Sequence, residues 1–216
     1  MRKFEQELAQ IKQQVVEMGA LAESMVALAS KAFLTRDRAL TLQVRDAEET
    51  LDRSQIALDR EAIRLITVYT PTAKDLRFLL MVVRINTELE RIGDQAMNNV
   101  EYLEMFLSDP PSRPLNDLSR MADITSSMVR EAMQAFEHED LGKAGHVLKL
   151  DDSVDALNAL TFQDLVAEGG DGPESLKRSM SLILLARSLE RIADHATNIC
   201  EEVVFLVKGE DIRHQT

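Results

Sequence analysis

The chain carries the same ten-residue segment twice, 100 positions apart. Residues 89–98 read Leu-Glu-Arg-Ile-Gly-Asp-Gln-Ala-Met-Asn, residues 189–198 read Leu-Glu-Arg-Ile-Ala-Asp-His-Ala-Thr-Asn, and seven of the ten positions are identical. Residues further upstream also recur, at a spacing of 103, beginning with Met25-Val26 and Met128-Val129. A repeat of this length predicts two similar halves that pack against each other.

Apolar residues recur in steps of three and four along most of the chain, which is the period of an amphipathic helix. No stretch alternates with the period of a strand, and 45% apolar residues are enough to form a packed core. The sequence predicts an all-α fold of two tandem antiparallel three-helix bundles, related by an approximate internal twofold axis. The expected helices cover 3–35, 37 to about 69, 72–107, a fourth that begins between 115 and 118, 140–167 and 173–208.

Proline and glycine mark the expected boundaries. Three of the five prolines lie in residues 109–114, and proline cannot continue a helix. We expect this segment to connect a first bundle at 1–108 to a second bundle at 115–216. The strongest helix breaker is Gly-Gly-Asp-Gly at 169–172, directly before the sixth helix.

The residues at the expected helix starts have side chains suited to those positions. Asp37 and its repeat Asp140 are predicted to accept hydrogen bonds from free amides at the start of the second helix of each half. Asn116 or Asp117 is predicted to do the same for the fourth helix. Proline in a first helical turn loses no hydrogen bond, so Pro71 and Pro173 are expected there.

The net charge of −12, from 37 acidic and 25 basic residues, argues against a nucleic-acid ligand and favours cations or basic proteins. The longest apolar run, residues 78–83, is far too short to cross a bilayer, so we expect a cytosolic protein. The single cysteine, Cys200, excludes an internal disulfide, and we expect it to pack inside a helical bundle.

The repeated segments place carboxylates four residues apart. Glu90 and Asp94, and likewise Glu190 and Asp194, lie on successive turns of one helix face. Upstream on the same faces we expect buried apolar residues. These are Leu76 and Val83 in the first half and Leu176 and Ile183 in the second.

The second helix of each half carries acids at equivalent positions, 103 residues apart. They are Glu48, Glu49 and Asp52 in the first half and Asp151, Asp152 and Asp155 in the second. Carboxylates from two neighbouring helices would repel each other, and a multivalent cation would relieve that repulsion. Oxygen ligands suit Mg, Mn, Ca or iron, whereas zinc usually takes Cys or His, and His195 is the one imidazole beside these acids.

The alternative is that these acids form a solvated helix face or a partner surface without metal. Asn98 and Asn198 are equally open to two roles, as neutral ligands or as hydrogen-bonding groups. The sequence thus predicts ten candidate ligands but leaves their role open.

Two enzyme classes also use helical carboxylates. A di-iron oxidase needs Glu-x-x-His, which occurs nowhere in the chain. A Mg-dependent nucleotide pyrophosphohydrolase would use paired acidic motifs such as Glu101/Glu104 and Glu137/Asp140. The proline connector separates these two pairs, and neither pair is repeated in the other half.

The segment 189–199, its copy at 89–98, Met18-Gly19, and the run from Pro71 to Arg77 resemble the PhoU family over essentially the whole chain. The resemblance implies two three-helix bundles whose Glu/Asp motifs bind metal clusters, with ligand roles for Glu90, Asp94, Glu190 and Asp194. It implies the same, less directly, for the acids of the second helices.

The resemblance also implies a function. It implies a cytosolic, non-enzymatic negative regulator of the phosphate-starvation response, peripherally associated with membrane complexes. Its partners would be the ATPase subunit of the phosphate ABC transporter and a sensor histidine kinase, and exposed leucine and valine side chains are candidate homodimer contacts. No nucleophile with a base and no glycine-rich phosphate loop was found, in keeping with an adaptor that has no catalytic turnover.

Overall fold

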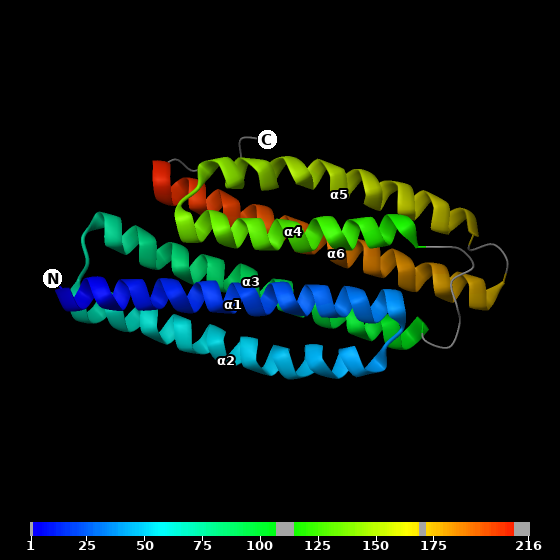
Figure 1. The fold of residues 1–216 in the computed structure, drawn as a ribbon, viewed down its shortest axis with the longest axis horizontal. Helices are drawn as coiled ribbons and strands as arrows, with labels where there is room; N and C mark the ends of the chain where they lie inside the picture. The colour runs from blue at the N-terminus through cyan, green and yellow to red at the C-terminus, as the bar shows by residue number, and fades with distance from the viewer. Residues whose placement is uncertain (1, 107–114, 169–171, 210–216) are drawn as a thin grey trace.

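The computed structural model describes residues 2–106, 115–168 and 172–209, and this part of the chain is all helical (Figure 1). The all-α prediction is confirmed, and the helix bounds agree with the expected ranges to within a few residues. The helices are α1 (Arg2–Thr35), α2 (Arg38–Tyr69), α3 (Ala73–Phe106), α4 (Asn116–His138), α5 (Leu141–Glu168) and α6 (Pro173–Lys208). None of these helices is both long enough and apolar enough to cross a membrane.

The helices form two three-helix bundles that dock side by side. Helices α1, α2 and α3 all contact one another, and α6 contacts both α4 and α5, which also touch. The bundles meet where α3 packs on α6 and α1 packs on α4, with α2 and α5 at the two outer edges (Figure 1). The predicted pair of bundles, related by an approximate twofold axis, is confirmed.

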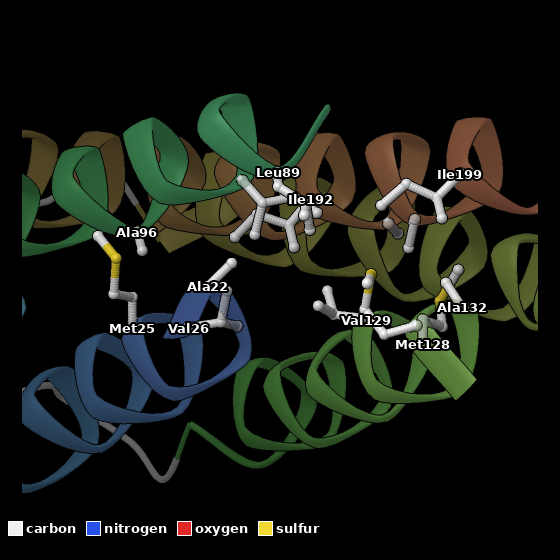
Figure 2. Close-up of a cluster of buried hydrophobic side chains, with 14 of the residues drawn as sticks. Ala22, Met25, Val26, Leu89, Ala96, Met128, Val129, Ala132, Ile192 and Ile199 are labelled. Carbon is white, nitrogen blue, oxygen red and sulfur yellow. The ribbon is translucent and has the colours of Figure 1, made fainter. Parts of the chain in front are cut away.

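A continuous apolar core joins the two bundles. Figure 2 shows apolar side chains of α1, α3, α4 and α6 facing one another at the docking surface, among them Met25, Leu89, Met128 and Ile192. Each of these four side chains is fully buried. Because the same apolar stripe faces both the helices of its own bundle and the other bundle, the two halves share one core.

Most helix starts follow the expected chemistry. Asp37 Oδ1 accepts from the Ala39 amide at 2.9 Å, and Asp140 Oδ1 accepts from the Gly142 amide at 2.8 Å. Pro173 is the first residue of α6, as expected. The predicted caps of α2 and α5 are therefore confirmed.

Two expectations at helix starts are wrong. Leu115, rather than Asn116 or Asp117, is the cap residue of α4, and no side chain caps that end. Pro71 precedes α3, because Thr70 adopts a left-handed conformation that ends α2 and the helix begins only at Ala73. The predicted connector at 109–114 and residues 169–171 lie outside the described residues, so the limits at 108 and 115 stay predictions.

The two repeats differ in how they fill one equivalent point of the core. Gly93 of α3 lies against the buried Leu51 of α2, and a Cβ added at Gly93 would overlap Leu51 Cδ2. In the second bundle Ala193 and Val154 occupy these positions. The larger α2 side chain thus faces glycine, and the smaller α5 side chain faces alanine.

The apolar stripes before the acidic segments are less buried than the sequence suggested. Leu176 is 54% exposed, while Leu76, Val83 and Ile183 are half-buried. The expectation of a buried stripe is wrong for Leu176, whose side chain the described helices leave largely uncovered.

Candidate functional site

Carboxylates of α2 and α3 gather into a first acidic patch, formed by Glu48, Asp52, Glu90 and Asp94. Burial is the main cause that raises the pKa of Glu90, and the charges of Asp94 and Asp52 raise it further. Glu48 behaves in the same way, with burial first and then Asp52 and Asp94 raising its pKa. Because the charge of Asp52 contributes to the raised pKa of Glu48, Glu90 and Asp94, the four carboxylates form one electrostatic unit.

The second acidic patch, on α5 and α6, consists of Asp151, Asp155, Glu190 and Asp194. Burial raises the pKa of Asp151 to about 6, helped by the charges of Asp155 and Asp194. Burial and Asp155 also raise the pKa of Asp194, while Asp194 and Asp155 add to the effect of burial on Glu190. Asp151 Oδ1 is buried and accepts no hydrogen bond from the described residues.

Two of the ten candidate ligands lie outside the patches. Glu49 is exposed and pairs with Arg53 of its own helix at 2.9 Å. Asp152 is exposed on α5, and its charge raises the pKa of Asp151 less than burial, Asp155 and Asp194 do. On a helix, neighbours in sequence point about 100° apart, so both side chains leave the face that carries the patch.

The donor set of each patch consists of carboxylate oxygens, which suit hard cations. Across the described ranges, no three or more His, Cys, Asp or Glu side chains converge closely enough to hold an ion in their present rotamers. Raised carboxyl pKa values and the unpartnered oxygen of Asp151 mark both patches as places where positive charge would be stabilised.

A polar cluster that the sequence analysis did not find joins the two bundles between the patches. Glu88 of α3 lies 2.8 Å from His195 Nδ1 and accepts from Asn198 Nδ2 at 3.0 Å, both from α6. Burial opposes the ionised form of Glu88, but these two hydrogen bonds, together with the charges of His195 and Arg91, outweigh it and lower the pKa of Glu88. His195 thus lies against Glu88, and its charge offsets part of the rise in the pKa of Asp94 and Asp194 that burial and the neighbouring acids cause.

The equivalent cluster at the other end of the contact is neutral. Ser188 of α6 donates to Gln95 of α3, 3.0 Å from its carbonyl oxygen, and Asn98 donates to Gln95 Oε1 at 3.3 Å. Asn198 therefore forms a hydrogen bond across the contact between bundles, whereas Asn98 bonds to Gln95 of its own helix. The one signal of the asymmetry in the sequence is that Glu88 and His195 are replaced by Ser188 and Gln95 in the repeat.

The PhoU domain model matches residues 15–103 and 118–203, one match on each bundle. The chain belongs to the PhoU family. It is 33% identical over 214 residues to the phosphate-specific transport system accessory protein PhoU homolog of Pseudomonas putida, covering 99% of this chain and 84% of that protein. The homolog from Aquifex aeolicus is also 33% identical, over 99% of this chain and 96% of its own length.

Solved PhoU structures share the fold. The crystal structure of PhoU from Pseudomonas aeruginosa superimposes with a TM-score of 0.92 at 31% identity, over 96% of this chain and 100% of that one. PhoU from Streptococcus pneumoniae superimposes with a TM-score of 0.89 at 24% identity, which supports the fold alone. The expected family is confirmed, and each PhoU repeat contributes one acidic patch.

The acidic pairs of the pyrophosphohydrolase alternative are not brought together. In the described part of this PhoU-family chain α3 does not contact α4, so Glu101 and Glu104 lie apart from Glu137 and Asp140. Asp140 caps α5, and Glu104 pairs with Arg45 at 3.1 Å. Glu104 and Asp140 thus have local structural roles.

Proposed function

We propose that this chain is a non-enzymatic accessory protein of phosphate transport that restrains phosphate uptake and the phosphate-starvation response. In this proposal it acts in the cytoplasm and links the ATPase subunit of the phosphate ABC transporter to a sensor histidine kinase. The observation that carries the proposal is the family match on both bundles, together with relatives named as accessory proteins of phosphate-specific transport.

We further propose that the two acidic patches bind cations, iron, Mg, Mn or Ca, with water completing the coordination. The support is physical. In each patch four carboxylates from two helices lie so close together that three of them have raised pKa values, and the patches occupy equivalent places in both repeats. A bound cation would remove that repulsion without being needed to fold the chain, because the apolar core is continuous. The alternative without metal makes the same patches a partner surface.

A binding experiment tests the adaptor role. Purified chain is captured by the immobilised ATPase subunit and by the cytoplasmic region of the kinase. We expect binding to both, reduced by a variant with Glu90, Asp94, Glu190 and Asp194 changed to Ala. The control changes Glu49 and Asp152 to Ala, two exposed acids outside the patches. Failure of the unmodified chain to bind either partner would refute the adaptor role.

A second experiment separates the metal-bound patch from the metal-free alternative. Elemental analysis of protein purified without chelator is compared between the unmodified chain, the four-fold Ala variant and the Glu49/Asp152 control. We expect metal in the first and third samples and its loss in the second. Equal metal content in all three samples would exclude the patches as its site.

A further inference from the structure

A surface groove of about 540 Å³ runs between α5 and α6 on the side away from α4. We call it the α5/α6 groove. Ile183, Arg187 and Glu190, spaced three and four residues apart on one face of α6, form one side of the groove. One face of α5 forms the other side. The lining residues are Asp155, Asn158, Ala159, Phe162, Gln163, Ile183, Arg187 and Glu190.

One end of the α5/α6 groove is apolar. Phe162 lines it and is 51% exposed. Val166 lies one turn further along α5, and Leu176 and Met180 precede Ile183 by whole turns on α6, so they extend the same two faces. These three side chains are between 52% and 56% exposed. Large apolar side chains gathered on neighbouring faces mark an interaction surface.

The other end of the groove is acidic. Asp155 and Glu190 line it, and both belong to the second acidic patch, which continues to Asp151 and Asp194. Four carboxylates there outnumber the guanidinium groups of Arg187 and Arg191, the cations that oppose the pKa rise of Glu190. The groove therefore passes from an apolar half to a negatively charged half along its length.

The first repeat has a different residue at the centre of the equivalent surface, although Ile63 and Leu80, its counterparts of Val166 and Met180, are also exposed. Asp59 stands at the position equivalent to Phe162, and it accepts a 2.9 Å hydrogen bond from Asn86 Nδ2, where the second repeat has Ala186. A carboxylate held by an amide thus replaces the exposed ring and its apolar neighbour. The exposed aromatic ring of Phe162 therefore distinguishes the α5/α6 groove from the equivalent surface of α2 and α3.

We propose that the α5/α6 groove binds an amphipathic helix of a partner protein whose apolar residues lie toward one end and whose Lys or Arg residues lie toward the other. Helix-in-groove docking buries the apolar face of the guest between two helices, and the acidic end attracts its cations. From Asp151 to Val166 the groove, with the acidic and apolar residues that extend it on α5, spans roughly 22 Å at 1.5 Å per residue, about four helical turns. A second copy of this chain fits poorly, since its net charge is −12.

A peptide experiment tests the proposal. The probe is a fluorescent 16-residue helical peptide with leucines on one face of its first two turns and lysines on that face of its last two turns. The control peptide has the same composition in shuffled order. Anisotropy is measured with a chelator present, and we expect the patterned peptide to bind about tenfold more tightly than the shuffled one.

Point variants locate the binding. Phe162→Ser and Met180→Ser should each weaken binding about tenfold without unfolding the chain, because both side chains are half exposed. Asp155→Asn should weaken binding and reduce its salt dependence. The control is Leu42→Ser, an equally apolar and exposed site on α2, which should bind as the unmodified chain does.

Three results would overturn the proposal. They are equal binding of the shuffled peptide, equal loss in Leu42→Ser, and a Phe162-dependent dimer in sedimentation, which would make a second copy the occupant. The proposal extends the adaptor role proposed above to a binding face. The peptide assay contains no phosphate, transporter or kinase, so it is independent of the capture experiment. If the peptide does not bind but the ATPase subunit and the kinase still capture the chain, only the groove proposal is refuted. If neither partner captures the chain, the adaptor role is refuted.

Discussion

Replacing Asp151 by Asn should stabilise the metal-free protein. Asp151 lies half-buried among Asp155, Asp194 and Glu190, and its Oδ1 accepts no hydrogen bond from the described residues. At neutral pH the folded state must hold this charge next to like charges, whereas the unfolded chain exposes it to water. Asparagine is close in size and neutral, so it removes the repulsion and leaves the packing unchanged.

The pKa of Asp151 gives the magnitude. A rise from 3.8 to about 6 corresponds to roughly 3 kcal/mol of lost stability when the group is ionised in both states, at about 1.4 kcal/mol per pKa unit. Solvent around the half-buried carboxylate screens part of this effect. We therefore expect Asp151→Asn to raise the free energy of unfolding by about 1 to 3 kcal/mol at pH 7.5.

The effect should depend on pH in a defined direction. Because the folded-state pKa of Asp151 lies above the unfolded value, the proton stabilises the fold below pH 3.8, and that stabilisation is lost as the pH rises through about 6. The unmodified chain and Asp151→Asn should thus be equally stable near pH 3.8. Their difference should grow up to about pH 6 and stay constant above it.

Urea unfolding followed by circular dichroism, with a chelator present, measures this difference at each pH. The control is Glu49→Gln, which removes an exposed carboxylate of α2 outside both patches and should change the free energy of unfolding by less than about 0.5 kcal/mol. A destabilised Asp151→Asn, or a gain that does not vary with pH, would refute the account of the patch as a repelling cluster.

Three further predictions concern packing and helix ends. Gly93→Ala should destabilise the chain by about 1 to 3 kcal/mol through overlap with Leu51, and adding Leu51→Val should restore most of the loss; additive effects in urea unfolding would contradict this. Arg84→Ala removes the guanidinium 3.1 Å from both oxygens of the buried Glu202, and thermal unfolding should show a loss of about 1 to 2 kcal/mol; an unchanged midpoint would rule out a contribution of this pair. Asp140→Ala should cost about 1 kcal/mol by freeing two amides of α5, a loss that a calorimetric melt can detect or exclude.

Much of the fold was readable from local patterns. Apolar spacing predicted six helices, and Asp37, Asp140 and Pro173 marked three of their starts, because these features depend on residues close in the chain. Leu115 was missed as a cap because the cap depends on backbone conformation, and its side chain makes no hydrogen bond there. The duplication predicted a second bundle like the first.

The acidic site was predictable in part. Helical spacing placed Glu90 with Asp94 and Glu190 with Asp194 on one helix face. The recurrence of acids at a spacing of 103 residues added those of the second helices to the predicted site. Which of two adjacent acids faces the patch, Glu48 or Glu49, depends on the rotation of α2 against α3. That rotation is set by packing between helices, and packing involves residues distant in the chain.

The linear order of residues already specified two helical repeats, their acidic stripes and the family, since periodicity and duplication are properties of neighbours along the chain. The pairing of α3 with α6 brought Glu88 to His195 across the bundles, and the open side of α5 and α6 left Phe162 and Leu176 exposed. Those features arise only when the bundles dock, because each depends on surfaces that two separate segments bury or leave uncovered together.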